Sequence, residues 1–287
     1  MVISLGGAFM RKSFLPILVC SLLVSGCTAL PKEARENPTK ITSMIEKKSI
    51  PADFIPKDIK VVMIGDSLTE GIGDQTKKGG YLSFLKELLE DEKGINKAEL
   101  INFGVSGHRT TQLLDRLKRP EVNSAIEEAD LVIITIGGND MMKVVRENLT
   151  NLDMKDFEND KKFYKKNLTD VLTKIRTENH NGSIVLVGLY NPFSVALSEI
   201  KEIDQVVSDW NETSQKITSK YYQAYFVEIA DIFQKNNIDA ILHTDFFHPN
   251  NAGYKLIGER VYSVLNKRVL DNFSNLVLSV NKEEIQP

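Results

Sequence analysis

Five short apolar runs, separated by stretches with helical spacing, constrain the fold of this chain more than any other feature. The runs cover Lys60–Asp66, Glu99–Phe103, Leu131–Ile136, Ile184–Leu189 and Tyr225–Ile229. Each has the length and composition of a buried strand. Strands that alternate with helices predict right-handed βαβ units and a parallel sheet with helices on both faces. We find no internal repeat and no second domain, and therefore predict one domain over residues 58–270.

Large apolar residues recur at helical spacing in the segments between and after these runs. The segments span Tyr81–Leu89, Leu113–Leu117, Phe157–Ile175, Ile200–Ile217 and Tyr254–Leu265. We predict a helix in each of them, packed against the sheet. The stretch 141–156 fits either a lid or a plain connection.

The first 27 residues have the pattern of a secretion signal. Arg11 and Lys12 precede an apolar stretch that is too short to span a bilayer unaided, and small residues then lead to Cys27. This ending resembles a bacterial lipoprotein signal, which implies cleavage before Cys27 and lipidation of its thiol. The alternative is a plain secretory peptide in which Cys27 is incidental. Residues 1–9 fit the signal poorly, which suggests that translation starts at Met10.

The N-terminal signal predicts an extracytoplasmic protein that is anchored to the bacterial cell membrane by lipid on Cys27. Residues 28–57 are polar and contain four prolines, so we interpret them as a tether, and residues 271–287 as a C-terminal tail. The net charge of −3 argues against nucleic acid as a partner. Both cysteines, Cys20 and Cys27, precede the domain, which excludes an internal disulfide, a cysteine-ligated metal and a cysteine nucleophile there.

Polar residues stand where a sheet of this kind binds its ligand, beyond the carboxyl ends of the strands. Ser67 follows the first predicted strand, Gly104 the second and Asn139 the third, while His248 precedes the last helix. A serine becomes a nucleophile when a histidine takes its proton, and a carboxylate such as Asp245 can orient that histidine from the same loop. The N–H groups of Ser67 and Gly104 and the Asn139 amide can donate to an oxyanion. The pattern predicts acyl transfer.

Four ordered segments that carry these residues resemble the GDSL family, also called SGNH hydrolases. They are Val62–Thr69, Asn102–Gly107, Gly137–Asp140 and Asp245–Pro249. The resemblance spans roughly residues 58–268 and implies a flavodoxin-like three-layer α/β/α fold and ester hydrolysis without a metal or other cofactor. It implies Ser67 as nucleophile, His248 as base and Asp245 as acid, with Ser67, Gly104 and Asn139 as oxyanion hole. The G-x-S-x-G motif of α/β-hydrolases is absent from the chain.

Several neighbouring residues have plainer interpretations. Taken alone, Ser67 could be a helix-capping serine. Asp66 and Asp140 are expected to support loops by hydrogen bonds, and His108 to have a surface role. His243 with Asp245 and His248 could suggest a metal site, but three residues of one loop rarely complete a coordination shell, so we predict no metal.

The sequence leaves the substrate open between three alternatives. Loop residues could line an apolar acyl pocket or simply pack; they are Met141, Met142, Pro192, Phe193, Phe246 and Phe247. A pocket would favour a small-molecule ester or lipid, with a lipid-like or short-to-medium acyl group in ester or thioester linkage. An O-deacetylase of wall polysaccharide would use the same triad. A non-catalytic binding lipoprotein is the third alternative.

Overall fold

A five-stranded parallel sheet runs through the described part of the computed structural model, which comprises residues 55–148, 150–191, 193, 202–234 and 238–270. The strands are β1 (Lys57–Gly65), β2 (Ile95–Gly104), β3 (Leu131–Thr135), β4 (Ser183–Val187) and β5 (Ala224–Val227). Their order is β2-β1-β3-β4-β5, and every neighbouring pair is parallel. This is the flavodoxin-like order, in which the site lies where the order reverses.

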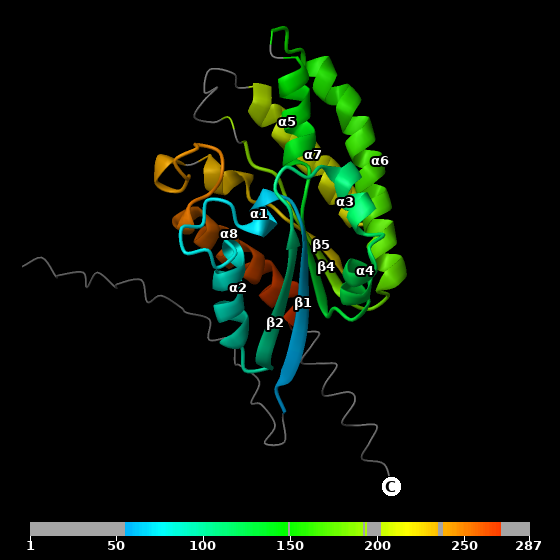
Figure 1. Cartoon of the computed structure of the whole chain (residues 1–287), viewed down its shortest axis with the longest axis vertical. Helices are drawn as coiled ribbons and strands as arrows, with labels where there is room; N and C mark the ends of the chain where they lie inside the picture. Colours follow the sequence, from blue (N-terminus) through cyan, green and yellow to red (C-terminus); the bar gives the residue numbers. More distant parts are fainter. Residues whose placement is uncertain (1–54, 149, 192, 194–201, 235–237, 271–287) are drawn as a thin grey trace, which may run out of the picture. The chain divides into compact units, whose positions relative to one another are not determined.

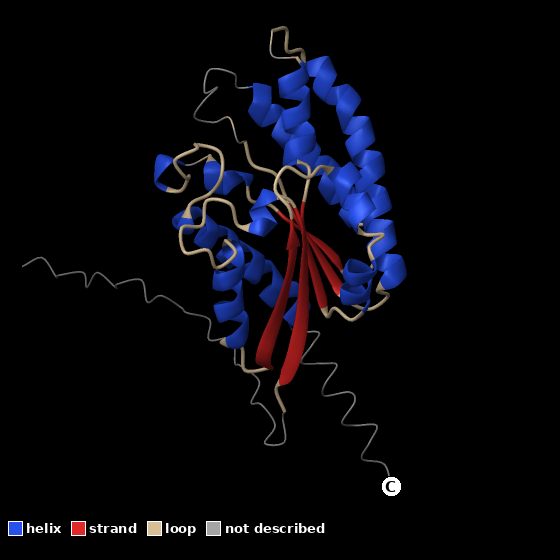
Figure 2. Cartoon of the chain, viewed as in Figure 1, coloured by secondary structure: helices blue, strands red, loops and turns tan. Residues whose placement is uncertain are grey.

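Helices cover both faces of the sheet and make three layers (Figure 1; Figure 2). One layer holds α2 (Tyr81–Glu90) and α8 (Asn251–Leu265). The other holds α3 (Thr110–Arg116), α4 (Pro120–Glu127), α6 (Met154–Glu178) and α7 (Glu202–Thr218). The short helix α1 (Ser67–Glu70) follows β1, and α5 (Gly138–Glu147) follows β3. The predicted α/β/α architecture is confirmed.

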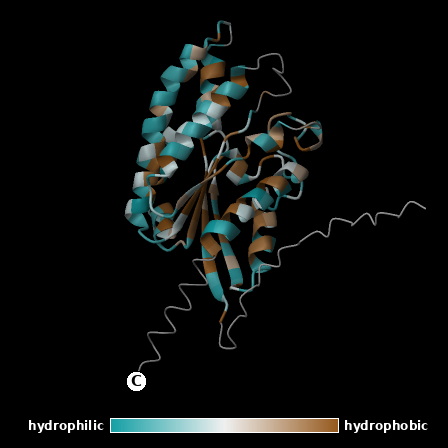
Figure 3. Cartoon of the chain, turned by 180° about the vertical axis from the view of Figure 1, so that it is seen from behind, coloured by the Kyte–Doolittle hydropathy of each residue, from teal (hydrophilic) through white to brown (hydrophobic). Residues whose placement is uncertain are grey.

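The central strands are buried on both faces, which explains their continuous apolar sequence. Every residue of β3 (LVIIT) and of β4 (SIVLV) is buried. Because side chains alternate along a strand, Val62 and Ile64 point into the core under α6 and α7, whereas Val61 and Met63 point into the core under α2 and α8. Figure 3 shows the result, with hydrophobic strands between helices whose outer faces are hydrophilic.

Three α-helices of the described residues were not predicted from the sequence: the one-turn helix α1, α4 and α5. Helix α4 begins with Pro120 at its first turn and buries only Val122 and Ile126. Helix α5 buries Met141, Val144 and Val145 and partly buries Met142, while its other residues are polar or glycine. Short helices with so few apolar positions give a weak periodic signal. Residues 141–147 therefore lie in α5, a helix that packs against the core.

The predictions for the two ends of the chain lie outside the described residues. These are the signal at residues 1–27, the tether up to residue 54 and the tail at 271–287. Among the helices that the structure describes, none combines the length and apolar character needed to cross a membrane.

Candidate active site

Ser67 lies at the carboxyl end of β1, as the first residue of α1. The Asp66 carboxylate caps this helix by accepting a hydrogen bond from the Leu68 N–H at 3.1 Å. The side chain of Ser67 is at the edge of the buried interior, with the residue 6% exposed. Its own N–H is in the first turn and has no acceptor within the helix. The hydroxyl and a free amide donor are thus presented together.

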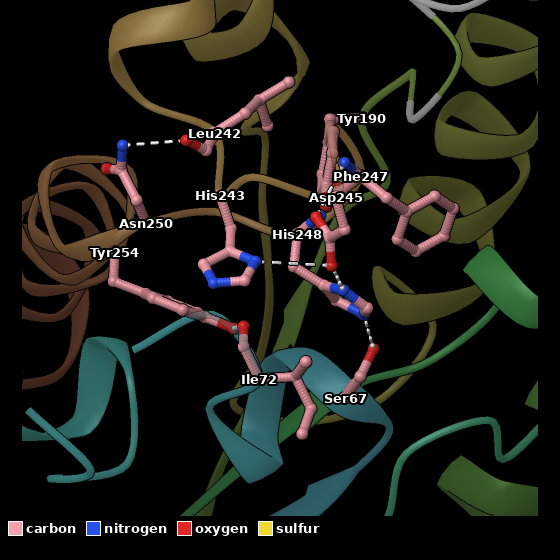
Figure 4. A network of polar contacts seen from close by, with 10 residues as sticks. All are labelled: Ser67, Ile72, Tyr190, Leu242, His243, Asp245, Phe247, His248, Asn250 and Tyr254. Atoms are coloured by element: carbon pink, nitrogen blue, oxygen red, sulfur yellow. Dashed lines mark hydrogen bonds and ion pairs between the residues drawn. The ribbon is translucent and has the colours of Figure 1, made fainter. Parts of the chain in front are cut away.

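A distant loop brings His248 to the Ser67 hydroxyl and places Asp245 behind His248 (Figure 4). His248 Nε2 lies 3.0 Å from Ser67 Oγ, although 181 positions separate the two residues. His248 Nδ1 lies 2.7 Å from Asp245 Oδ2. The three side chains form a continuous hydrogen-bonded chain in which the imidazole can accept the serine proton while the carboxylate holds the opposite ring nitrogen.

The loop around His248 is fixed by backbone hydrogen bonds. Asp245 Oδ1 accepts from the N–H groups of Phe247 and His248 at 3.0 and 2.9 Å. The Tyr190 hydroxyl donates to the Phe247 carbonyl at 2.6 Å, and the His243 N–H donates to the His248 carbonyl at 2.7 Å. Partial burial alone would raise the pKa of Asp245, but hydrogen bonds from His248 and Phe247 outweigh it and hold this pKa at about 2. Asp245 is therefore a carboxylate throughout the neutral range.

The three predicted oxyanion donors are not equally available to a ligand. The Asn139 side-chain amide donates one hydrogen bond to the His108 carbonyl at 3.1 Å, which leaves its second hydrogen for a ligand. The Gly104 N–H donates to the Asn102 side-chain oxygen at 2.8 Å. Asn102 in turn donates to the Thr69 carbonyl at 2.8 Å. Sequence analysis gave no sign of this competing acceptor, because it depends on the packing of β2 against α1.

Gly104 is required by packing as well as by any role as a donor. A Cβ atom at this position would lie 2.2 Å from the Glu70 nitrogen and 2.6 Å from the Thr69 carbonyl carbon, both in the backbone of α1. The absence of a side chain therefore lets α1 rest directly on the end of β2. This close approach brings Ser67 beside the second strand.

Replacing Gly104 with alanine should destabilise the fold by about 1–3 kcal/mol, the usual cost of forcing an extra group into a packed region. Urea unfolding would measure the change. Gly138→Ala is the matched control, because a Cβ at Gly138 meets no atom within 4 Å. Equal stability of the two variants would show that the contact with α1 is not restrictive.

A buried hydrogen-bonded network of Asp66, Thr135 and Thr69 holds the segment that carries Ser67. Asp66 Oδ1 accepts from the Thr135 hydroxyl at 2.8 Å, and Thr135 Oγ1 lies 2.8 Å from Thr69 Oγ1. Burial raises the pKa of Asp66 to about 7 against the opposing effect of these hydrogen bonds. Asp140 accepts from the N–H and hydroxyl of Thr110 at 3.0 and 2.6 Å, and burial raises its pKa as well. Both aspartates make the loop-supporting hydrogen bonds that the sequence suggested.

The raised pKa of Asp66 predicts a stability that depends on pH. Between pH 3.8, the ordinary value for the unfolded chain, and about pH 7, the folded protein binds a proton that the unfolded chain has lost. Wild-type stability should therefore fall as pH rises through this window. Asp66→Asn keeps the acceptor oxygen without the charge. The free energy of unfolding of this variant, relative to that of wild type, should therefore increase from pH 5 to pH 8, to a difference of at most about 4 kcal/mol.

Denaturant unfolding at pH 5 and pH 8 tests this prediction. Asp91→Asn, at an exposed position, is the control and should shift stability equally at the two pH values. A difference between Asp66→Asn and wild type that stays constant with pH would contradict the burial argument.

An apolar cavity opens beside the Ser67 hydroxyl. Its volume is about 30 Å³, and it is lined by Asp66, Ser67, Leu68, Thr135, Ile136, Gly138, Asn139, Val187, Gly188, Leu189, Tyr190 and Phe247. Of the five described residues among the six considered for an acyl pocket, Phe247 alone is in this lining. Met141 and Phe193 are buried in the core under α6 and α7, Phe246 is half exposed, and Pro192 lies outside the described residues.

The other histidines near the site make different contacts. His108 presents its carbonyl to Asn139, while its buried Nδ1 has no partner among the described residues. His243 Nδ1 lies 3.6 Å from Asp245 Oδ2, farther than His248. Within the described ranges, no group of three or more His, Cys, Asp or Glu side chains is arranged to hold a metal ion.

Comparison with known proteins decides the family. The sequence matches the GDSL-like lipase/acylhydrolase family over residues 63–256, more than half of the chain. The chain belongs to this family. The uncharacterised protein YpmR of Bacillus subtilis (strain 168) is 36% identical over 250 residues, covering 87% of this chain and 94% of YpmR. The spore germination lipase LipC of Bacillus licheniformis is 27% identical over 209 residues, or 71% of this chain and 94% of LipC.

Solved structures agree with the fold. The lipase Lip_vut3 from a goat rumen metagenome superposes with a TM-score of 0.65 at 26% identity, covering 71% of this chain and 96% of that lipase. A catalytic mutant of the acetylxylan esterase Axe2 from Geobacillus stearothermophilus gives a TM-score of 0.57 at 17% identity, over 75% of this chain and 96% of the esterase. Membership of the GDSL family makes this protein a carboxylic ester hydrolase.

Proposed function

We propose that the protein hydrolyses short-chain carboxylic esters through a Ser-His-Asp triad formed by Ser67, His248 and Asp245. The observation that carries the proposal is the unbroken hydrogen-bonded chain of 3.0 and 2.7 Å between these three side chains. It is supported by the spacing of the acid and base. Two mutants of the acetylxylan esterase Axe2, each described as catalytic, replace an aspartate and a histidine three residues apart, the separation of Asp245 and His248.

The reaction would proceed in two displacements. Ser67 Oγ attacks the ester carbonyl carbon as His248 Nε2 takes its proton. The tetrahedral intermediate collapses when His248 returns this proton to the leaving alcohol, which leaves an acyl group on Ser67. A water then attacks the acyl carbonyl carbon and loses a proton to His248. As the second tetrahedral intermediate collapses, His248 returns this proton to Ser67 Oγ, and the acid is released. Asp245 stays ionised and steadies the imidazolium.

The oxyanion would be stabilised first by the Ser67 N–H and the free amide hydrogen of Asn139. The Gly104 N–H can add a third hydrogen bond if the Asn102 side-chain oxygen shares or releases it. Each preorganised donor of this kind contributes roughly 3–4 kcal/mol to lowering the barrier. The apo arrangement of Asn102 therefore favours a site that tightens when substrate binds.

The size of the cavity beside Ser67 supports a short acyl group. About 30 Å³ of accessible space corresponds to roughly two water molecules. An acetyl group suits such a space better than an octanoyl chain. The same observation keeps an O-deacetylase of wall polysaccharide as the second candidate, because acetyl is the group that it would remove.

A series of 4-nitrophenyl esters tests the acyl preference in the full-length protein. We expect kcat/KM to fall at least about tenfold from the acetyl to the octanoyl ester, since the longer chain would have to leave the cavity or displace its walls. The kcat/KM for the 4-nitrophenyl butanoyl ester should lie between these two values. An octanoyl ester hydrolysed as fast as the acetyl ester would contradict the short-acyl assignment while leaving ester hydrolysis itself intact.

We also propose that the mature protein acts outside the cytoplasm, held at the membrane by lipid on Cys27. The proposal rests on the sequence of residues 1–27, which are outside the described part of the structure. Expression in a bacterial host should give membrane-bound protein that partitions into detergent, whereas Cys27→Ala should not. Equal partitioning of both forms would contradict the anchor.

A further inference from the structure

A second, larger hollow begins on the other side of Asn139. Its volume is about 290 Å³, and it is lined by Gly107, Arg109, Asn139, Lys143, Arg146 and Glu147. Asn139 also lines the small cavity beside Ser67, so the two spaces share a wall at the proposed oxyanion donor. A substrate whose carbonyl group reached Asn139 could therefore extend one of its substituents into each space.

The charges lining the larger cavity do not balance. Three of its residues are basic and one is acidic. The acidic residue, Glu147, forms an ion pair with Lys143. The Lys143 ammonium lies 3.2 Å from the Glu147 carboxylate and 2.9 Å from that of Asp160. Lys143 and Glu147 thus contribute little net field to the cavity.

The two arginines differ from Lys143 in having no such partner. Among the described residues, no carboxylate lies within ion-pair distance, 4.0 Å, of the guanidinium of Arg109 or Arg146. Arg146 uses one donor, Nε, on the Met142 carbonyl at 3.3 Å. The nearby carboxylate of Asp140 is buried and accepts hydrogen bonds from Thr110. Burial raises the pKa of this carboxyl, and Arg109 is close enough to lower it in part, but the two groups are not paired directly. Two guanidinium groups without a direct ion-pair partner among the described residues therefore border the cavity.

We infer that this cavity is an anion subsite, in which Arg109 and Arg146 bind a phosphate or carboxylate on the alcohol part of the ester. Planar guanidinium groups present paired donors that match the oxygens of both anions. The inference rests on the proposed function, because the small cavity must take the acyl group for the alcohol part to lie beyond Asn139. The arginines act here as specificity-determining residues and take no part in bond breaking.

Matched esters test the subsite in the full-length protein. 4-Acetoxybenzoate and 4-acetoxybenzamide share an acetyl group and a phenol and differ in charge. We expect wild type to favour the anionic ester about tenfold in kcat/KM at low salt. Arg109→Gln and Arg146→Gln should each lower this ratio at least threefold through a higher KM for the anionic ester. Arg146→Lys should retain part of the preference.

Lys97→Gln is the charge-matched control. Lys97 is exposed near the start of β2, at the opposite end of that strand from Gly104, and is not in the cavity lining. Its loss changes the net charge equally but should leave the ratio unchanged. A second pair, acetylglycerol phosphate and acetylglycerol, determines whether phosphate is preferred to carboxylate. Comparing acetyl- with octanoylglycerol phosphate distinguishes a small phosphorylated alcohol from a lipid headgroup as its source.

The outcomes separate this inference from the proposed function. Equal kcat/KM for the charged and neutral members of both pairs would overturn the anion subsite, and so would an equal loss of preference in Lys97→Gln. Failure of wild type to hydrolyse any of these esters would instead count against the proposed function. A ratio that collapses only in the Arg109 and Arg146 variants would support the subsite.

Discussion

Ser67→Ala is expected to lower kcat/KM for acetyl esters by about 10⁴–10⁶-fold without unfolding the protein. The substitution removes the hydroxyl that lies 3.0 Å from His248 Nε2 but keeps the backbone N–H at the start of α1. A loss of this size is typical when one member of a serine triad is removed, and the remaining rate comes from binding and oxyanion stabilisation. Hydrolysis of 4-nitrophenyl acetate measures it.

Circular dichroism and thermal unfolding must accompany this assay, because Ser67 is nearly buried. Ser83→Ala is a matched control, since Ser83 lies on α2 and its hydroxyl bonds only to the Gly80 carbonyl. It should retain wild-type activity. More than about a tenth of wild-type activity in well-folded Ser67→Ala would remove this residue from the nucleophile's role.

His248→Ala should have an effect of similar size, and the double variant with Ser67→Ala should be little worse than either single variant. Residues that act as one unit give strongly non-additive losses, because removing either one disables the shared step. His248 Nε2 lies 3.0 Å from Ser67 Oγ, so in the proposed mechanism the two side chains share one proton transfer. Single and double variants are compared by kcat/KM on the same ester.

His180→Ala provides the control for replacing a histidine, since His180 is exposed in the turn before β4. Its activity should equal that of wild type. Losses from Ser67→Ala and His248→Ala that simply multiplied in the double variant would mean that the two side chains work in separate steps.

The sheet was predictable from sequence because its strands are buried on both faces. Burial demands runs such as LVIIT in β3 and SIVLV in β4, and few other structures require them. The residues that meet at the site were predictable for a related reason. Ser67 and Asn139 directly follow such strands, and parallel strands bring their carboxyl ends to one edge.

What sequence reasoning missed depends on contacts between segments that are distant along the chain. The Asn102 side chain that occupies the Gly104 N–H is set by the approach of α1, which no local pattern encodes. Part of the wall of the small cavity is formed by the end of β4 and the residues after it, Val187 to Tyr190, where the apolar sequence is typical of a strand. Met141, Met142 and Phe193, which the sequence suggested for a pocket, pack in or against the core instead. Burial of their apolar surface there stabilises the fold.

Covalent labelling of the full-length protein with a fluorophosphonate, followed by mass spectrometry of its peptides, tests the central assignment most directly. The probe loses fluoride to an activated serine and forms a stable bond to its oxygen. We expect one adduct per chain, located on Ser67, and none in His248→Ala over the same time. An adduct on another residue, or unlabelled Ser67 in protein that still hydrolyses esters, would contradict the account.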